Sequence, residues 1–113
     1  MDERARRVGK NEAVFREVNE QIETLNRGLA EISDNKLHIV CECGDLRCAK
    51  QLVVQVTEYE RIRADPALFF VIPGHEIPDV EDVVEQEPAY RVVRKHEGEP
   101  ARMARKLNPR DPE

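Results

Sequence analysis

The chain opens with a long amphipathic pattern. From residue 4 to residue 33, apolar side chains recur at alternating spacings of three and four, which predicts one helix with an a/d heptad seam. The seam consists of Val8, Phe15, Val18, Ile22, Leu25, Leu29 and Ile32, with Asn11 at the remaining position. So narrow a stripe favours pairing with another helix, yet a sheet in the same chain also needs a cover. We therefore expect either docking within the chain or a homodimer, and the partner-facing residues would be Phe15, Val18, Ile22, Leu25 and Leu29.

Shorter apolar runs fill the middle of the chain. They predict strands over residues 36–43, 51–56, 67–72 and 89–95. A helix is expected from residue 57 to residue 63 or 64, and another over 79–87, where Val80, Val83 and Val84 would share one face. After the long helix the order is thus β-β-α-β-α-β. This order predicts an α+β fold with a four-stranded sheet, antiparallel or mixed.

Three segments follow from these patterns. Residues 1–35 form the heptad-patterned helix, residues 36–97 form a small α+β domain, and residues 98–113 form a charged tail. The tail contains three prolines and little apolar material. We expect it to be flexible, with at most a turn or two of helix around residues 101–107.

Three cysteines and a histidine carry the chemistry of the middle segment. Cys41 and Cys43 alternate along a predicted strand, so both sulfurs point to one face. Gly44-Asp45 supplies the bend that lets Cys48 return towards them. His75 follows a Pro-Gly turn at the end of the most apolar strand. The four side chains predict one structural, tetrahedral Zn²⁺ per chain.

Other interpretations of these residues stay open. The cysteines could be small buried residues of an apolar core, although the charged residues between them argue against this. An iron–sulfur cluster is less favoured, because it usually takes four cysteines. His38 and His96 are rival fourth ligands; His38 alternates to the face opposite Cys41, and His96 stands among charges at a strand end, so His75 is preferred.

Composition explains why a metal would matter here. The chain has 113 residues, of which 36% are charged and only 4% aromatic, so the apolar supply for a core is thin. No run approaches the roughly 20 apolar residues of a membrane span, and the charged start does not resemble a signal peptide. An odd number of cysteines does not suit a disulfide framework. We expect a cytoplasmic protein without membrane association.

Charge is distributed unevenly behind the net value of −5. Residues 76–88 hold six acids and no Lys or Arg, whereas residues 89–110 hold seven Lys or Arg and two acids. The basic strip could pair within the chain, or bind an acidic partner through Arg102, Arg105 and Lys106. Nucleic acid is a weaker possibility, because the total charge is negative and aromatic residues are scarce.

Several short motifs together resemble a group of small uncharacterised bacterial proteins. The shared residues are Asn11-Glu12, Phe15-Arg16, Val18-Asn19-Glu20, Cys41-Glu42-Cys43, Cys48, Glu58-Tyr59-Glu60, Phe70-Val71, Pro73-Gly74-His75-Glu76 and Tyr90-Arg91-Val92-Val93. The resemblance covers most of the chain and supports the ligand set. It implies no activity.

The sequence favours a binding protein over an enzyme. Four protein ligands would close the metal site, and the chain has no phosphate loop, oxyanion-type glycine loop or paired-acid motif. We expect a zinc-stabilised binding or regulatory module that acts through protein contacts and could serve transcriptional control. The alternatives are a thiol redox switch that releases zinc on oxidation, and a nucleic-acid-binding accessory protein.

Overall fold

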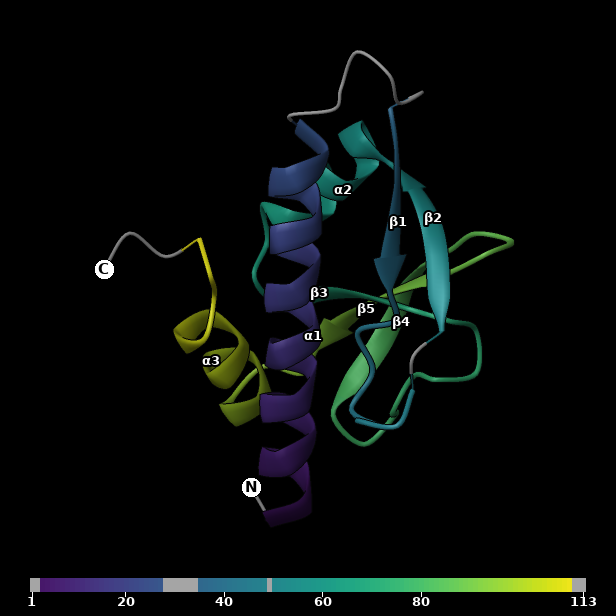
Figure 1. Ribbon diagram of the computed structural model, residues 1–113. Helices are drawn as coiled ribbons and strands as arrows, with labels where there is room; N and C mark the ends of the chain where they lie inside the picture. The colour runs from purple at the N-terminus through teal and green to yellow at the C-terminus, as the bar shows by residue number, and fades with distance from the viewer. Residues whose placement is uncertain (1–2, 28–34, 49, 111–113) are drawn as a thin grey trace.

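A long helix stands against two small antiparallel sheets in the computed structural model, which describes residues 3–27, 35–48 and 50–110 (Figure 1). The α+β class predicted from the sequence is confirmed. In chain order the elements are α1 (Glu3–Arg27), β1 (Lys36–Val40), β2 (Gln51–Gln55), α2 (Val56–Arg63), β3 (Leu68–Val71), β4 (Glu81–Gln86), β5 (Arg91–Lys95) and α3 (Glu99–Lys106).

The first sheet is the hairpin β1–β2. Its register pairs Leu37 with Val54 and Ile39 with Leu52, and all four side chains are buried while their neighbours on the strands face solvent. This alternation follows from the two-residue period of a strand. The buried face joins Tyr59, Ile62, Phe70 and Val92 in the main hydrophobic cluster.

The second sheet has the strand order β3-β5-β4 and is also antiparallel. The prediction of a helix over residues 79–87 is wrong, because residues 81–86 form β4, which pairs with β5. A spacing of three and four over so short a run does not distinguish the two periods. A bulge between Val83 and Glu85 leaves Val84 exposed. The described strands therefore number five in two sheets, instead of four in one.

Helix α1 has the predicted start and character, but its buried face differs from the predicted seam. Among the described residues the side chains it buries most deeply are polar: Glu12, Arg16, Asn19 and Glu23. These positions, i, i+4, i+7 and i+11, lie on one face. Residues 28–34, which include Leu29 and Ile32 of the predicted seam, lie outside the described residues.

The segment predicted to be a flexible tail is instead helical and packed. Ala101 and Ala104 of α3 are buried, and Figure 1 shows α3 beside the lower half of α1. After α3, Arg110 forms ion pairs with Glu20 of α1 and with Glu60 of α2 at 2.8 Å. Composition alone indicated disorder, whereas two small alanine side chains allow α3 to approach the rest of the protein.

None of the helices in the described ranges combines the length and the apolar character that crossing a membrane requires.

Candidate metal centre

The loop between β1 and β2 carries three of the four candidate ligands. Cys41 and Cys43 follow β1 directly, and both are buried. The backbone here is anchored on two sides: the Cys41 amide donates to the carbonyl of Lys50 at 2.9 Å, and the Glu42 amide donates to the carbonyl of Phe70 at 2.8 Å. The first bond joins the two ends of the loop, and the second attaches the loop to β3 of the other sheet.

A tight turn brings the third cysteine back. The Cys48 amide donates to the Asp45 carbonyl at 3.0 Å, and the Arg47 amide donates to Asp45 Oδ1 at 2.9 Å. An aspartate that accepts a bond from the amide two residues later is a typical turn-forming arrangement. Gly44 is required by packing, since a Cβ there would lie 2.7 Å from a methyl group of Val8.

The fourth candidate, His75, stands at the end of a turn that follows β3. The His75 amide donates to the Ile72 carbonyl at 2.9 Å, and Gly74 has φ +94°. Pro73 followed by a positive-φ glycine is the signature of a type II turn. Glu76 holds the turn from outside, because it accepts from the Gly74 amide at 2.8 Å and pairs with Arg91.

The four ligand atoms meet at one point. His75 Nδ1 lies 3.6 Å from the sulfur of Cys41 and 3.6 Å from that of Cys48, and all four ligand atoms, that of Cys43 included, lie within 4.8 Å of one another. Ligands at roughly 2.0 to 2.3 Å from a tetrahedral zinc ion are separated by roughly 3.3 to 3.8 Å. The cluster could therefore hold a metal ion with small adjustments of the side chains.

The electrostatics of the cluster favour a cation. Hydrogen bonding with Cys41 lowers the pKa of the Cys43 thiol to about 5, and the same bond together with burial raises the pKa of Cys41 above its ordinary value. The Ile72 amide also donates to the Cys41 sulfur, at 3.2 Å. A divalent cation between the two sulfurs would stabilise the thiolate form of both.

One side of the cluster is open. A hollow of about 320 Å³ adjoins it, lined by Cys43, Gly44, Asp45, Gly74, His75, Glu76 and Ile77. Cys48 and His75 are only partly buried, whereas Cys41 and Cys43 are enclosed. Half of the ligand set can therefore be reached from solvent.

Glu42, between the first two cysteines, holds the loop from the inside. Its side chain is fully buried and accepts three hydrogen bonds: from Arg63 at 2.6 Å, from Asn19 at 2.7 Å and from the Phe70 amide at 3.0 Å. The Arg63 guanidinium lies over the ring of Tyr59, 4.9 Å from its centroid. Glu42 thus ties the loop to α1, α2 and β3 through these three partners.

Helix α1 contacts both the end of β1 and the loop that follows it. Asn19 donates to the Val40 carbonyl and accepts from the Val40 amide, each at 2.9 Å. Asn11 donates to the Gly44 carbonyl at 2.9 Å, and Val8 packs directly on Gly44. Because these bonds are directional, the position of α1 and the shape of the cysteine loop depend on each other.

A second buried charge group joins α1 to the other sheet and to α3. Lys95 of β5 bonds to Glu12 at 2.6 Å and to Glu81 at 3.0 Å, and all three side chains are buried. Arg16 donates to the carbonyl of Ala104 in α3 at 2.8 Å and to a carbonyl before β3 at 2.7 Å. Lys95 of the basic strip therefore pairs within the chain, which is one of the two alternatives that the sequence left open.

The supporting role of Glu42, Asn19 and Arg63 was not predicted from the sequence. A signal for Glu42 was present, since a charge that alternates with two inward cysteines must face the opposite side of the strand. For Asn19 and Arg63 there was none, because a polar residue on a helix is ordinarily expected to face solvent.

The predicted partner-facing residues are divided by the fold. Phe15 and Ile22 are half-buried, with Ile22 against the main cluster, while Val18 and Leu25 are exposed. Leu29 lies outside the described residues. Arg102 and Lys106 are exposed on α3, as is Arg105, which pairs with Glu97 at 3.3 Å. The rival histidines lie elsewhere, His38 on the exposed face of β1 and His96 beside Asp82.

Comparison of the chain with protein-family models, curated proteins and solved structures found no match.

Proposed function

We propose that this protein is a zinc-stabilised binding module in which one Zn²⁺ per chain is held by Cys41, Cys43, Cys48 and His75. The observation that supports this most directly is the convergence of three sulfurs and a ring nitrogen within 4.8 Å. Thiolate with imidazole is the donor set typical of structural zinc, and an iron–sulfur cluster ordinarily needs a fourth cysteine.

A structural role is favoured over catalysis by the number of ligands. Four protein ligands complete a tetrahedral site and leave no position for water or substrate. The position of the site supports the same view, because its loop contacts β1, β3 and α1 at once. A metal there would join segments that a thin hydrophobic core holds weakly.

The module would act through contacts with other proteins, with transcriptional control as one setting. The described surface has aliphatic side chains in solvent on α1, among them Leu25 at 73% exposure. Where such side chains are contiguous, as Val14 and Val18 are in one groove on α1, they are typical of a binding surface.

Native mass spectrometry of the full chain, with and without a strong chelator, tests the metal. We expect one zinc per chain, and loss of the cooperative thermal transition once the zinc is removed. A chain purified under metal-replete conditions that carries no zinc would refute the proposal.

Histidine variants provide the matched control. His75→Asn should weaken zinc binding at least about tenfold, because it removes a ligand. His38→Asn changes the same residue type on the exposed face of β1 and should bind zinc as the native chain does. Equal zinc affinity in both variants would exclude His75 as a ligand.

A thiol redox switch is a second candidate, favoured by the open side of the cluster and the partial exposure of Cys48. Hydrogen peroxide would oxidise two of the thiolates to a disulfide, be reduced to two waters with uptake of two protons, and thereby release the zinc. Release under mild peroxide, followed by a zinc-sensitive dye and reversed by a dithiol with added zinc, would support it. A chain that keeps its zinc under these conditions is not such a switch.

A further inference from the structure

The outward side of the α1–α3 pair forms a shallow apolar groove. It has a volume of about 520 Å³ and is lined by Lys10, Ala13, Val14, Glu17, Val18 and Leu107. We call this groove and the cations beside it the α1–α3 surface. The aliphatic side chains in it are open to solvent: Val14 is 52% exposed, Val18 39% and Leu107 40%.

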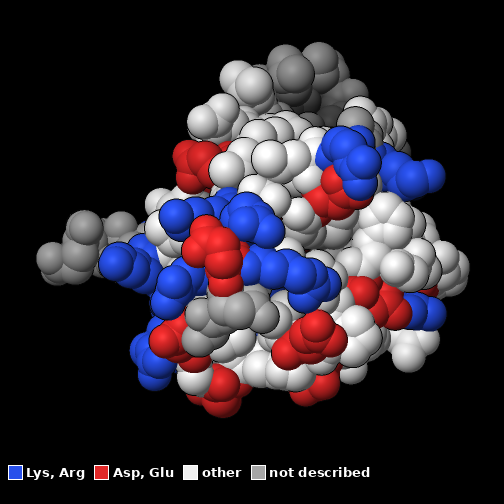
Figure 2. Space-filling model, turned by 90° about the horizontal axis from the view of Figure 1, so that it is seen from below, with Lys and Arg blue, Asp and Glu red and all other residues white. Residues whose placement is uncertain are grey.

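Five cations lie beside the groove at the end of the molecule where α1 begins. Arg6, Arg7 and Lys10 belong to α1, and Arg102 and Lys106 belong to α3. All five are exposed, and within the described ranges none of them is in an ion pair. Figure 2 shows Lys and Arg side chains gathered across this end of the molecule, with acids among them.

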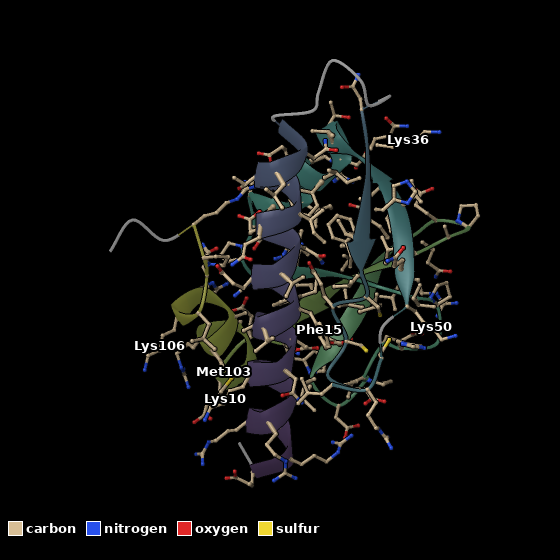
Figure 3. The ribbon with its side chains drawn as sticks, viewed as in Figure 1. Lys10, Phe15, Lys36, Lys50, Met103 and Lys106 are labelled. Carbon is tan, nitrogen blue, oxygen red and sulfur yellow. The ribbon has the colours of Figure 1, made fainter. Side chains whose placement is uncertain are left out.

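Close packing of the two helices brings these cations together from opposite ends of the chain. A Cβ at Gly9 would lie 2.4 Å from the Met103 sulfur, so α3 crosses α1 at that glycine. Figure 3 shows Lys10, Met103 and Lys106 side by side at this crossing.

Other basic residues of the C-terminal strip are paired with acids of the same chain. Arg91 pairs with Glu76, and Arg94 pairs with Asp65 at 2.8 Å. Arg110 is paired with acids of α1 and α2, and Lys95 is buried between two carboxylates. The unpaired positive charge is therefore concentrated at the α1–α3 surface.

We propose that the α1–α3 surface binds an acidic amphipathic helix of a partner protein, an assignment that rests on the proposed role as a binding module. A groove between two helices suits a helix whose apolar side chains enter it at i and i+3 or i+4 spacing. The five unpaired cations provide charge complementarity to glutamates or aspartates on the flank of that helix.

The groove also indicates an orientation. Lys10 and Glu17 both line it, seven residues and therefore about 10 Å apart along α1. The acidic end of the partner helix would lie over Lys10 and the cations of α3, and its neutral or basic end would lie over Glu17.

Two other occupants fit the surface less well. A second copy in a two-fold dimer would bring two sets of these five cations into one interface, where Glu17 is the one acid among the groove's lining residues on each copy, and this excess of like charge opposes association. Single-stranded nucleic acid is ordinarily bound with exposed aromatic rings for base stacking. Here Tyr59, Phe69 and Phe70 are buried, and Phe15 and Tyr90 are half-buried.

The test is an NMR titration of the zinc-loaded full chain with a synthetic helical peptide of about 16 residues. The peptide has leucines at spacings of three and four and glutamates on both flanks of its first half; two sister peptides replace the glutamates by lysine or the leucines by serine. We expect the first peptide to shift amide signals of α1 and α3 and both sister peptides to bind at least about tenfold more weakly.

Variants locate the binding. Lys10→Glu and Val18→Asp should each weaken binding of the glutamate peptide about tenfold, a loss of about 1.4 kcal/mol. Lys50→Glu and Val53→Asp make the same changes at exposed positions outside the surface and should not weaken it. All four positions are exposed, so unchanged thermal transitions should show that the variants fold.

Absence of signal shifts at about 1 mM peptide, or equal binding of the lysine peptide, would overturn the proposal. So would a concentration-dependent dimer that Val18→Asp abolishes, or tighter binding of a duplex DNA or a single-stranded RNA oligonucleotide. The zinc content of each sample is read separately by native mass spectrometry. If the zinc-loaded chain does not bind the peptide, only the proposed docking surface is refuted. If a zinc-free chain binds the peptide, only the proposed zinc site is refuted.

Discussion

The side chains that α1 buries most deeply on its inward face are polar, whereas its outward face carries aliphatic side chains in solvent. Inward, Glu12 and Asn19 are hydrogen-bonded to the sheets and the cysteine loop. Outward, Val14 and Val18 line a groove. An ordinary surface helix has the reverse arrangement.

The difference shows what each kind of contact contributes. Apolar contacts are non-directional and stabilise many arrangements of a helix, while hydrogen bonds to buried partners are satisfied in only one. The inward face therefore specifies where α1 lies and orders the cysteine loop. The outward face lies in solvent, and it is there that we propose a partner binds.

The largest effect is expected from removing the metal that the cysteine loop would hold. Cys43→Ser should lose the zinc and unfold residues 36–75, because structural zinc binds zinc-finger peptides with roughly 10 to 16 kcal/mol, comparable to the stability of a whole domain. Native mass spectrometry and circular dichroism measure the two effects. If Cys43→Ser unfolds at the same temperature as the native chain, the site is not structural.

The next largest effect is expected at the buried pair beside the ligands. Glu42→Gln leaves Arg63 buried without its counter-charge, which should lower the free energy of unfolding by about 3 to 5 kcal/mol. Urea titration of the zinc-loaded chain measures it. The exposed Arg61–Glu85 pair, at 2.6 Å, gives the control: Glu85→Gln should cost less than about 1 kcal/mol. Equal losses would show that Glu42 is not a buried support.

A smaller loss in the free energy of unfolding is expected when a hydrogen-bonding residue without charge is removed from the contact between α1 and the end of β1. Asn19→Ala leaves the Val40 amide and carbonyl without partners, at a cost of about 1 to 3 kcal/mol. Hydrogen exchange of the Val40 amide should speed up accordingly, whereas Gln21→Ala, at an exposed position of the same helix, should leave it unchanged. An unaltered Val40 exchange rate in Asn19→Ala would refute the contact.

Docking of the C-terminal segment should contribute about 1 kcal/mol. Burial alone would raise the pKa of Glu20, but hydrogen bonds from Arg110 and Tyr59 hold it below its ordinary value. The Arg110→Ala variant should therefore be less stable at neutral pH. The difference from the native chain should shrink as the pH falls through the lowered pKa of Glu20, because protonation removes one of the ion pairs of Arg110. A difference independent of pH would assign the effect to packing.

The smallest effect on stability is expected on the outward face. Val18→Asp should change the free energy of unfolding by less than about 0.5 kcal/mol, as for other exposed positions. Ile22→Asp, one turn further and packed against the core, should cost more than about 2 kcal/mol because it buries a carboxylate. Similar losses in the two variants would mean that the faces of α1 are not distinct.

Local patterns predicted much of the site. The bend after Cys43 and the turn before His75 follow from Gly44-Asp45 and Pro73-Gly74, which determine the backbone over a few residues. The preference for His75 over His38 came from strand alternation. What could not be predicted was the support from Asn19 and Arg63, since neither spacing nor hydropathy distinguishes a buried polar residue from a solvated one.

The heptad pattern was less informative because it treated all apolar positions of α1 as one seam. The fold divides them: Val8 and Ile22 face the protein, and Val18 and Leu25 face solvent. The helix predicted over residues 79–87 was wrong for a related reason. A run of six residues fits both the helix and the strand period, and only pairing with a neighbouring strand distinguishes them.

The sequence by itself determined the α+β class, the long first helix, the β1–β2 hairpin and the bends that present Cys48 and His75. These depend on interactions between residues close in the chain. Tertiary structure alone decided the inward polar face of α1, the division into two sheets and the meeting of Lys10 with Lys106. The physical reason is that burial and charge pairing depend on which distant segments come into contact. Short-range patterns of hydropathy do not determine those contacts.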